Sequence, residues 1–563
     1  MSYFKNPDVL LWELSHNPFE WIGPKDSRQY GWGSSLVQES TSMLIVREDS
    51  HLLDSTPILV GSGQFTDRQT NPELAYSPMG IAAEAAKAAL ADTGIGHELV
   101  AKIDTLAVVR IFQDSYKQPR IATSFGRAEN PPRAVARRIG ANPTNAIYAN
   151  VGGNTPQKLI NEMAERISSC DVSVVLLTGS EAIRTAQLAR RNNIELNWQE
   201  EDAGSQEDRG LGEALANAHE RAHGLIAPIQ AYPLFENAIR KDKGRPVDEH
   251  LLSMGKLFAP FTDVASNNPF SYYGTRRSAT ELASVTKENR FICFPYPKFM
   301  NSRDAVNQGA AVVMTSVGKA KQLGIDPSKW VFLHGCSEAN EKLLISDRVN
   351  LHSSPAIVAN SQQAFAMANK TIEDIDLIDI YSCFPSAVEV ACDALGLSYS
   401  DPRGLTLTGG LPFFGGPGNN YSMHAIATAI PLLRADPQQY ALITANGGRL
   451  SKHATGIYSA TPLRGKWERE SNAKIQAQIN AMPSPEFIEA PSGVAKIETY
   501  TVCFDKTNPV SGIVIGRLLE TDQRFIANTA SDESTLRKMM RDDFLASNGT
   551  VVSSGGLNTF TAA

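Results

Sequence analysis

The residue with the most evident chemical capacity is Cys383, in the segment Tyr381-Ser382-Cys383-Phe384-Pro385. The apolar run IDLIDIYS before it predicts a buried strand, and Pro385 is typical of the first turn of a helix. The dipole and free N–H groups at a helix start stabilise a thiolate, so this position predicts a lowered pKa and a nucleophile or acid/base. The alternative is a buried thiol that serves only as a small apolar side chain.

A glycine-rich segment, GGLPFFGGPGNNYSMH (409–424), predicts a loop that approaches another group closely and leads into a helix. Gly415, Gly416 and Pro417 are candidate contacts to a thioester or pantetheine arm, and tight packing against a sheet is the alternative. His424 falls in the first helical turn, where the helix dipole lowers the imidazole pKa and keeps the ring neutral at pH 7. A neutral imidazole could serve as a base or a hydrogen-bond donor.

The strand YALITANGG (440–448) ends in a second small cluster, Ala445-Asn446-Gly447-Gly448. Asn446 could direct its amide at an oxyanion, or it could only cap the turn, and the residues leave both interpretations open. Gly447 and Gly448 are candidate substrate contacts beside it.

The segment VGGN (151–154) is built like a nucleophile site but contains no Cys, Ser or His. The strand NAIYAN precedes it, and a helix is expected to begin with Thr155 as N-cap and Pro156 at the first position. Such a turn directs backbone N–H groups and the positive helix end at an oxyanion or a thiolate. The candidate substrate contacts of this turn are Gly152, Gly153 and Asn154.

The run His219-Glu220-Arg221-Ala222-His223 matches the H-E-x-x-H pattern of zinc proteases. Its surroundings are polar, Arg221 would lie beside the cation, and no spaced third ligand follows. We therefore expect a solvent-exposed helix face here, and the sequence predicts no metal site.

The elements that position these residues alternate strands and helices, which indicates an α/β fold. Two halves each contain a strand-to-helix turn that could face a common site. A charged, loop-rich insertion interrupts the first half and could cover that site. The predicted parts are a peripheral extension (1–55), a first half (56–330) with the insertion (181–290), a second half (331–465), a helix-prone linker (466–489) and a small β-rich domain (490–563).

The composition is that of a folded protein without a strong charge bias: 563 residues, 42% hydrophobic, 20% charged and a net charge of −7. No global basic field favours nucleic acid, and no run of 18 apolar residues predicts a membrane span. Six cysteines without CxxC spacing indicate a reducing compartment. We expect an intracellular protein, cytoplasmic or peroxisomal/mitochondrial, without a recognisable signal.

Over roughly residues 56–465 these motifs together resemble the thiolase superfamily, and most nearly the sterol-carrier-protein-type thiolases and thiolase-like (type 1) proteins with an additional C-terminal domain. Residues 381–384 lie where that branch has His-Asp-Cys-Phe, and 415–417 lie where a thiolase has Gly-His-Pro. Residues 445–448 correspond to Cys-x-Gly-Gly. The turn 151–154 lies where the nucleophilic Cys should be.

The resemblance implies a layered αβαβα architecture of two similar halves and an inserted loop domain that receives coenzyme A. It implies acyl transfer through a Cys thioester, with a coenzyme A thioester as substrate or ligand and no permanently bound cofactor. The departures are severe, because the nucleophilic Cys is missing, Gly416 replaces the activating His, and Ala445 replaces the acid/base Cys. Standard thiolase chemistry is therefore not expected.

Two functions from different classes remain open. The first is an acyltransferase acting on an acyl-CoA or related thioester, with Cys383 as nucleophile or acid/base and His424 as its base or proton relay. Asn446, with backbone N–H groups around Gly152 and Gly153, would then form the oxyanion hole. The second is a non-catalytic acyl-CoA or acyl-carrier binding protein, or a partner subunit of an active enzyme. Cys383 together with His424 slightly favours the enzyme.

The C-terminal segment alternates as a β-hairpin would, in KIETYTVCFD (496–505) and SGIVIGRLL (511–519). We expect a small barrel of OB type there. Its scattered cations lack interleaved aromatic residues, so no nucleic-acid role is expected. Docking on the thiolase-like body could replace a dimer contact, which leaves monomer or homodimer open.

Overall fold

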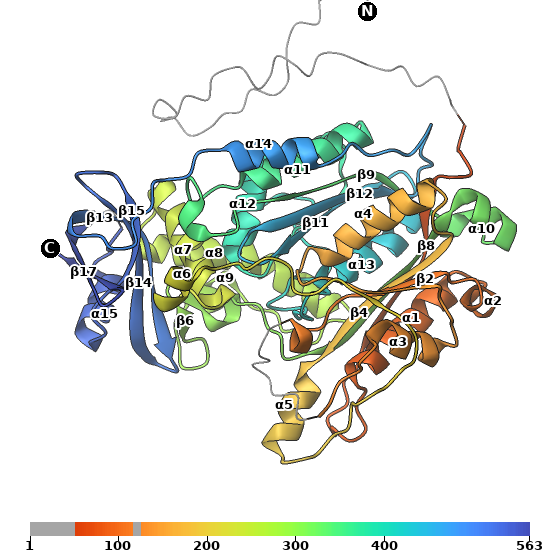
Figure 1. Cartoon of the computed structure of the whole chain (residues 1–563), viewed down its shortest axis with the longest axis horizontal. Helices are drawn as coiled ribbons and strands as arrows, with labels where there is room; N and C mark the ends of the chain where they lie inside the picture. Colours follow the sequence, from red (N-terminus) through yellow and green to blue (C-terminus); the bar gives the residue numbers. More distant parts are fainter. Residues whose placement is uncertain (1–50, 116–124, 546) are drawn as a thin grey trace, which may run out of the picture. The chain divides into compact units, whose positions relative to one another are not determined.

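The computed structural model describes residues 51–115, 125–545 and 547–563, so all but the last five residues of the expected extension (1–55) lie outside the described part (Figure 1). Ten strands form one large mixed sheet. They are β1 (Pro57–Thr66), β2 (Thr105–Val108), β3 (Asn145–Tyr148), β4 (Val174–Ala182), β5 (Glu207–Asp208), β8 (Asn307–Ser316), β9 (Val331–Asn340), β10 (Leu377–Asp379), β11 (Tyr440–Gly447) and β12 (Lys452–Ser459). Their order across the sheet is β10-β11-β12-β9-β1-β8-β4-β2-β3-β5.

The sheet consists of two similar halves that meet where β1 pairs with β9. The register there joins Ile58 to Phe332 and Leu59 to Val331. In the first half β1 is antiparallel to β8, β8 is antiparallel to β4, and β4 is parallel to β2. In the second half β9, β12, β11 and β10 repeat the same three pairings. The expectation of two similar α/β halves is confirmed.

Helices cover both faces of this sheet, as the thiolase resemblance implied. Helices α4 (Thr155–Ser168) and α13 (Tyr421–Ala435) pack on each other and contact strands of both halves. Leu59 of β1 faces these central helices, whereas its neighbours Ile58 and Val60 face the outer helix α1 (Pro78–Asp92), because successive strand residues point to opposite faces. Other outer helices are α3 (Pro131–Ile139) on the first half, and α11 (Pro355–Ala368) and α12 (Pro385–Leu395) on the second.

Helix α4 begins one residue before its expected position. The N-cap is Asn154, and Thr155 is the first helical residue. The Thr155 hydroxyl donates to the carbonyl of Asn150, at 3.0 Å, and so does not cap the helix. Among the described helices, none combines the length and apolar character that crossing a bilayer requires.

The insertion is mainly helical between residues 218 and 283, so the expectation of a loop-rich segment is wrong there. Buried apolar residues recur at helical spacing, as in Ala231, Leu234, Phe235 and Ala238. Internal prolines and a high content of charged residues in the first part of the insertion obscured that pattern. The helices are α5 (Ile183–Arg191), α6 (Ala218–Ala222), α7 (Pro228–Asp242), α8 (Val247–Asn267) and α9 (Ala279–Ala283).

The C-terminal residues form a closed five-stranded barrel. Strand β13 pairs with both β14 and β16, and β15 pairs in parallel with β17. This order, with a helix between the third and fourth strands, is that of an OB fold, and it confirms the expected small barrel. The elements are β13 (Gly493–Asp505), β14 (Asn508–Leu518), β15 (Arg524–Asn528), α15 (Glu533–Arg541), β16 (Asn548–Ser554) and β17 (Leu557–Ala562).

The barrel docks on the inserted helices and on strand β6 (Phe291–Cys293), which pairs with β13 (Figure 1). Asn237 of α7 donates from Nδ2 to the Tyr500 carbonyl at 2.8 Å. Arg240 of the same helix, 1% exposed, makes a two-pronged ion pair with Asp543. Docking of the additional domain on the thiolase-like body is confirmed.

The H-E-x-x-H run also belongs to this interface, so the expectation of a solvent-exposed helix face is wrong. His223 is buried and accepts on Nε2 from the backbone N–H of Asn558 in β17, at 3.0 Å. Glu220 is buried and accepts from the N–H and hydroxyl of Ser346. Asn558 and Ser346 lie more than one hundred residues from this run, which is why local polarity was misleading.

The docked barrel depends on Arg524, a fully buried arginine of β15. Its guanidinium pairs with Glu498 and donates to the carbonyl oxygens of Ser346, Arg348 and Val349. We expect Arg524→Met to lower the free energy of unfolding by about 3 kcal/mol, because the carboxylate and the carbonyls lose their partner. Urea denaturation measures the change.

The matched control is Arg537→Met on α15, whose ion pair with Glu533 is exposed on both sides. Loss of this pair should change the free energy of unfolding by less than about 0.5 kcal/mol. Equal effects of the two substitutions would contradict an anchoring role for Arg524.

Candidate functional site

The strand-to-helix turn of the first half, at residues 151–154, lies against the strand-to-helix turn before α12 and against the end of β11 in the second half. A Cβ added at Gly153 would lie 2.3 Å from the Tyr381 hydroxyl and 2.5 Å from the Asn446 carbonyl, so only glycine fits. A Cβ at Gly447 would lie 2.5 Å from Oδ1 of Asn154. The expected juxtaposition is confirmed, although the groups that these glycines approach are protein atoms. A ligand role for Gly152, Gly153, Asn154, Gly447 and Gly448 stays a prediction.

Cys383 lies in the second of these turns, directly before Phe384, the N-cap of α12. Nδ2 of Asn446 lies 3.8 Å from its Sγ atom. Asn446 is the last but one residue of β11, where the sheet brings it to the start of α12. The structure thus brings together two of the three predicted catalytic residues.

Burial decides the ionisation of Cys383. The side chain is 7% exposed, and loss of hydration raises the pKa of its thiol to about 12. Hydrogen bonds from Tyr232, from backbone N–H groups at the helix start and from Asn446 favour the thiolate but do not outweigh burial. The prediction of a lowered pKa is wrong, because the same helix end that stabilises a thiolate is here closed off from water.

Tyr232 of α7 closes the site, and no sequence motif indicated it. Its ring is 2% exposed and stacks on Phe384 with centroids 4.4 Å apart. Burial raises the pKa of its hydroxyl well above the usual value, so the phenol is neutral. The residue lies in the segment expected to cover a site, but the sequence does not show which helix face turns inward.

Two N–H donors converge on the Tyr232 oxygen. Nδ2 of Asn446 donates at 2.9 Å, and the backbone N–H of Leu450 donates at 3.0 Å. Two fixed donors within 3 Å of one oxygen are the arrangement that binds a carbonyl oxygen or an oxyanion. The predicted oxyanion role of the Asn446 amide is therefore geometrically available, with the second donor at Leu450 rather than at the glycines, and with Tyr232 occupying the position.

A small cavity of about 10 Å³ lies behind Asn446, between β11, β12 and α11. Three polar atoms of its lining residues, Oδ1 of Asn446, Oδ1 of Asn360 and Nε2 of His453, have no hydrogen-bond partner among the described residues. The space suits about one water molecule, which needs two to four polar partners. It does not suit an acyl chain.

His424 lies in a different environment from Cys383. Its Nδ1 atom is 2.8 Å from Oε1 of Gln64 on β1, and its ring contacts Phe414 edge-on at 5.1 Å. Complete burial lowers the imidazole pKa to about 3, so the expected neutral ring is confirmed, with desolvation rather than the helix dipole as its cause. In the described part of the chain, its side-chain partners do not include Cys383 or Asn446.

The glycine-rich loop packs tightly against protein. A Cβ at Gly415 would lie 2.3 Å from Oε1 of Gln308, and one at Gly416 would lie 2.6 Å from Oγ of Ser302. The Gly416 N–H donates to the Arg303 carbonyl at 2.8 Å. These contacts support the packing interpretation, and the assignment of Gly415, Gly416 and Pro417 to a ligand stays a prediction.

Cys383 should be unreactive toward alkylating reagents in the folded protein. With a pKa of about 12, about one thiol in 10,000 is ionised at pH 8. We expect iodoacetamide to modify Cys383 at least about 100-fold more slowly than the exposed Cys170, as followed by peptide mass spectrometry. In urea the two rates should converge. Equal rates in the folded state would show that Cys383 is an activated thiol.

Buried His424 makes stability depend on pH. Its folded pKa of about 3 lies below that of an unfolded histidine, so the unfolded chain binds more protons between pH 3 and 6.5. We expect the free energy of unfolding to fall as the pH is lowered through this range, by up to about 1.4 kcal/mol per pH unit for this group. We expect the free energy of unfolding, measured by urea titration at each pH, to fall less steeply with decreasing pH in His424→Gln than in wild type. The exposed control His97→Gln should fall as steeply as wild type. Parallel curves for wild type and His424→Gln would refute this contribution.

Comparison with known proteins places this geometry in a family. A monomeric SCP2-thiolase-like protein type 1 from Mycobacterium smegmatis is 39% identical, with a TM-score of 0.77, and the match covers 91% of this chain and 100% of that one. The Ltp2-ChsH2(DUF35) aldolase is 16% identical, with a TM-score of 0.51, over 72% of this chain and 98% of the other. Human mitochondrial 3-ketoacyl-CoA thiolase in complex with CoA is 17% identical, with a TM-score of 0.50, over 73% of this chain and 100% of the other. The last two show the fold alone.

The C-terminal barrel gives a second, independent match. A family model for the thiolase-like protein type 1 additional C-terminal domain matches residues 474–556. No curated protein sequence matches the chain. Because the relative that spans nearly the whole chain and the additional domain agree, the chain belongs to the SCP2-thiolase-like proteins of type 1.

Proposed function

We propose that this protein binds an acyl thioester, an acyl-CoA or acyl-carrier conjugate, without forming a covalent cysteine intermediate. The thiolase fold is present, while the turn that would carry the nucleophile contains Val151, two glycines and Asn154. The one thiol near this turn, Cys383, is buried and protonated. Removal of a nucleophile and its base lowers covalent catalysis by several orders of magnitude, whereas binding can persist.

The observation that carries the proposal is the pair of donors on the Tyr232 oxygen. Asn446 and Leu450 offer two N–H groups to one acceptor, as a thioester carbonyl requires. In this conformation the Tyr232 hydroxyl takes the place of that carbonyl. A ligand would displace the phenol and accept the same two hydrogen bonds, so binding and movement of Tyr232 are coupled.

Acyl transfer by Cys383 is the second candidate, favoured by the 3.8 Å contact between its sulfur and the Asn446 amide. Displacement of Tyr232 would rehydrate the thiol and lower its pKa toward the usual range. His424 would not act as the base in this mechanism, because its ring is held by Gln64. Human mitochondrial 3-ketoacyl-CoA thiolase, which shares the fold, is described in complex with CoA, and this supports a coenzyme A ligand under both candidates.

We also propose that the protein acts as a monomer, as its Mycobacterium smegmatis relative is described. The docked OB-type barrel covers the inserted helices, and it uses buried contacts such as Arg240 with Asp543 to do so. A surface covered in this way is not free for a second copy of the chain.

Calorimetric titration with CoA, acetyl-CoA, acetoacetyl-CoA and a long-chain acyl-CoA tests the proposal, with intact-protein mass spectrometry on the same mixtures. We expect Tyr232→Phe to bind acyl-CoA about tenfold more tightly than wild type, because it keeps the ring and removes the competing oxygen. Tyr76→Phe, at a partly exposed tyrosine away from the site, is the matched control and should bind like wild type. No acyl adduct should form on any variant.

Two outcomes would contradict the proposal. An acyl adduct and thiol release that Cys383→Ala abolishes would establish the acyltransferase instead. Absence of binding to every thioester, in wild type and in Tyr232→Phe alike, would remove the thioester ligand altogether.

A further inference from the structure

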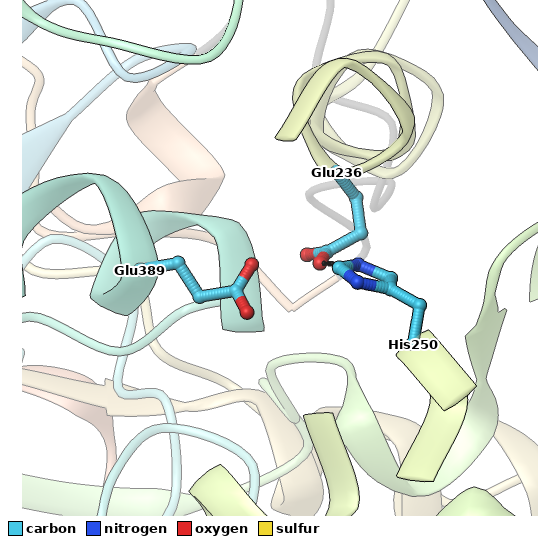
Figure 2. A group of neighbouring side chains, drawn as sticks. All are labelled: Glu236, His250 and Glu389. Atoms are coloured by element: carbon cyan, nitrogen blue, oxygen red, sulfur yellow. Dashed lines mark hydrogen bonds and ion pairs between the residues drawn. The ribbon is translucent and has the colours of Figure 1, made fainter. Parts of the chain in front are cut away.

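Three buried side chains outside the candidate site point toward one another between three helices (Figure 2). They are Glu236 of α7, His250 of α8 and Glu389 of α12, and all three are fully buried. Nε2 of His250 lies 2.6 Å from Oε1 of Glu236. Each residue offers one ligand atom to the group, and these atoms all lie within 4.8 Å of one another.

The carboxylate of Glu389 is the unusual member of this cluster. It points toward Glu236 and His250, and with both carboxyls ionised neither of its oxygens has a hydrogen-bond partner among the described residues. Burial raises the pKa of both Glu389 and Glu236, so a proton shared between the two carboxyls links them when no cation is bound. Arg245 forms a long ion pair with Oε1 of Glu389 through Nη1, at 3.8 Å, which compensates the charge in part but is too long for a hydrogen bond. A buried carboxylate without hydrogen bonds costs several kcal/mol unless a cation or a proton compensates it.

The other carboxylate of the cluster, that of Glu236, is held in place by a hydrogen bond from a neighbouring side chain. The Tyr296 hydroxyl lies 2.6 Å from Oε2 of Glu236, to which it donates, and 2.7 Å from Oγ of Ser386. This contact fixes the Glu236 carboxylate and leaves Oε1 directed at the cluster. Metal-binding carboxylates are held by such outer partners in proteins.

Imidazole with two carboxylates is a donor set that binds Zn²⁺, and also Mn²⁺ or Fe²⁺. Two carboxylates balance the charge of one divalent ion, which relieves the cost of burying them. The 2.6 Å distance between His250 and Glu236 would have to widen to about 3.3 Å around a tetrahedral ion with bonds of about 2.0 Å. That change is within the reach of side-chain rotation.

We propose that Glu236, His250 and Glu389 form a divalent transition-metal site, with Zn²⁺ as the best-fitting ion. This site is separate from the H-E-x-x-H run and revises the expectation that the chain has no metal site. The ion would tie the inserted helices α7 and α8 to α12, the helix that begins directly after Cys383. Because Tyr232 and Glu236 are four residues apart on α7, the ion would also fix the helix that carries Tyr232.

Titration of the chelator-treated full-length protein with Zn²⁺, by calorimetry and by metal analysis after dialysis, tests this proposal. We expect one ion per chain and a higher melting temperature with the ion bound. Glu389→Gln keeps the side-chain volume and removes the anionic ligand, so it should weaken binding by about 100-fold or more. Tyr296→Phe changes only the outer shell and should weaken binding by about tenfold.

His219→Asn is the matched control, because it removes one of the two histidines of the competing H-E-x-x-H run and should leave Zn²⁺ affinity within about twofold of wild type. Circular dichroism verifies that each variant is folded. If Glu389→Gln does not fold, Tyr296→Phe serves as the test. Stoichiometric Zn²⁺ binding that is lost in His219→Asn but kept in Glu389→Gln and Tyr296→Phe would overturn the proposal. Absence of binding of Zn²⁺, Mn²⁺ and Fe²⁺ by wild type would also overturn it.

Discussion

The hydroxyl of Tyr232 accepts two hydrogen bonds in the protein interior, and the arrangement of the candidate site depends on them. The donors, Asn446 and Leu450, come from the end of β11 and the turn after it, while the acceptor comes from the inserted helix α7. The ring of Tyr232 stacks on Phe384, the N-cap of α12. Loss of this one oxygen would leave two buried donors unpaired, at about 1–3 kcal/mol each. A single phenol therefore joins the insertion to the second half of the thiolase-like body.

Closure by Tyr232 explains why the groups around it are uncharged. Desolvation raises the pKa of the Cys383 thiol and of the Tyr232 phenol. The N-terminus of α12 lowers the pKa of the Cys383 thiol, but burial raises this pKa by more. The additional barrel also helps to fix the position of Tyr232. It forms hydrogen bonds with Asn237 and Arg240, which lie on the same helix as Tyr232. In this protein the extra domain and the closed site are thus linked through helix α7.

Much of the fold follows from local patterns in the sequence. Alternation of apolar strands with helices indicated both halves, and the hairpin at 496–519 indicated the barrel. The meeting of the turns at Gly153 and Gly447 also followed, because each turn ends a strand of a similar half. Tyr232 could not be predicted, since the two donors to its hydroxyl lie more than 200 residues away and periodicity does not reveal which helix face docks. The pKa of Cys383 was predicted in the wrong direction because a sequence shows a helix start but not its burial.

The most direct test of this account is a crystal structure of the protein with a non-hydrolysable acetyl-CoA analogue. The account predicts that the acyl carbonyl oxygen lies within hydrogen-bond distance of Nδ2 of Asn446 and the N–H of Leu450, with the Tyr232 hydroxyl displaced and the Cys383 sulfur unmodified. A structure in which Tyr232 keeps both hydrogen bonds while the analogue binds elsewhere would contradict it.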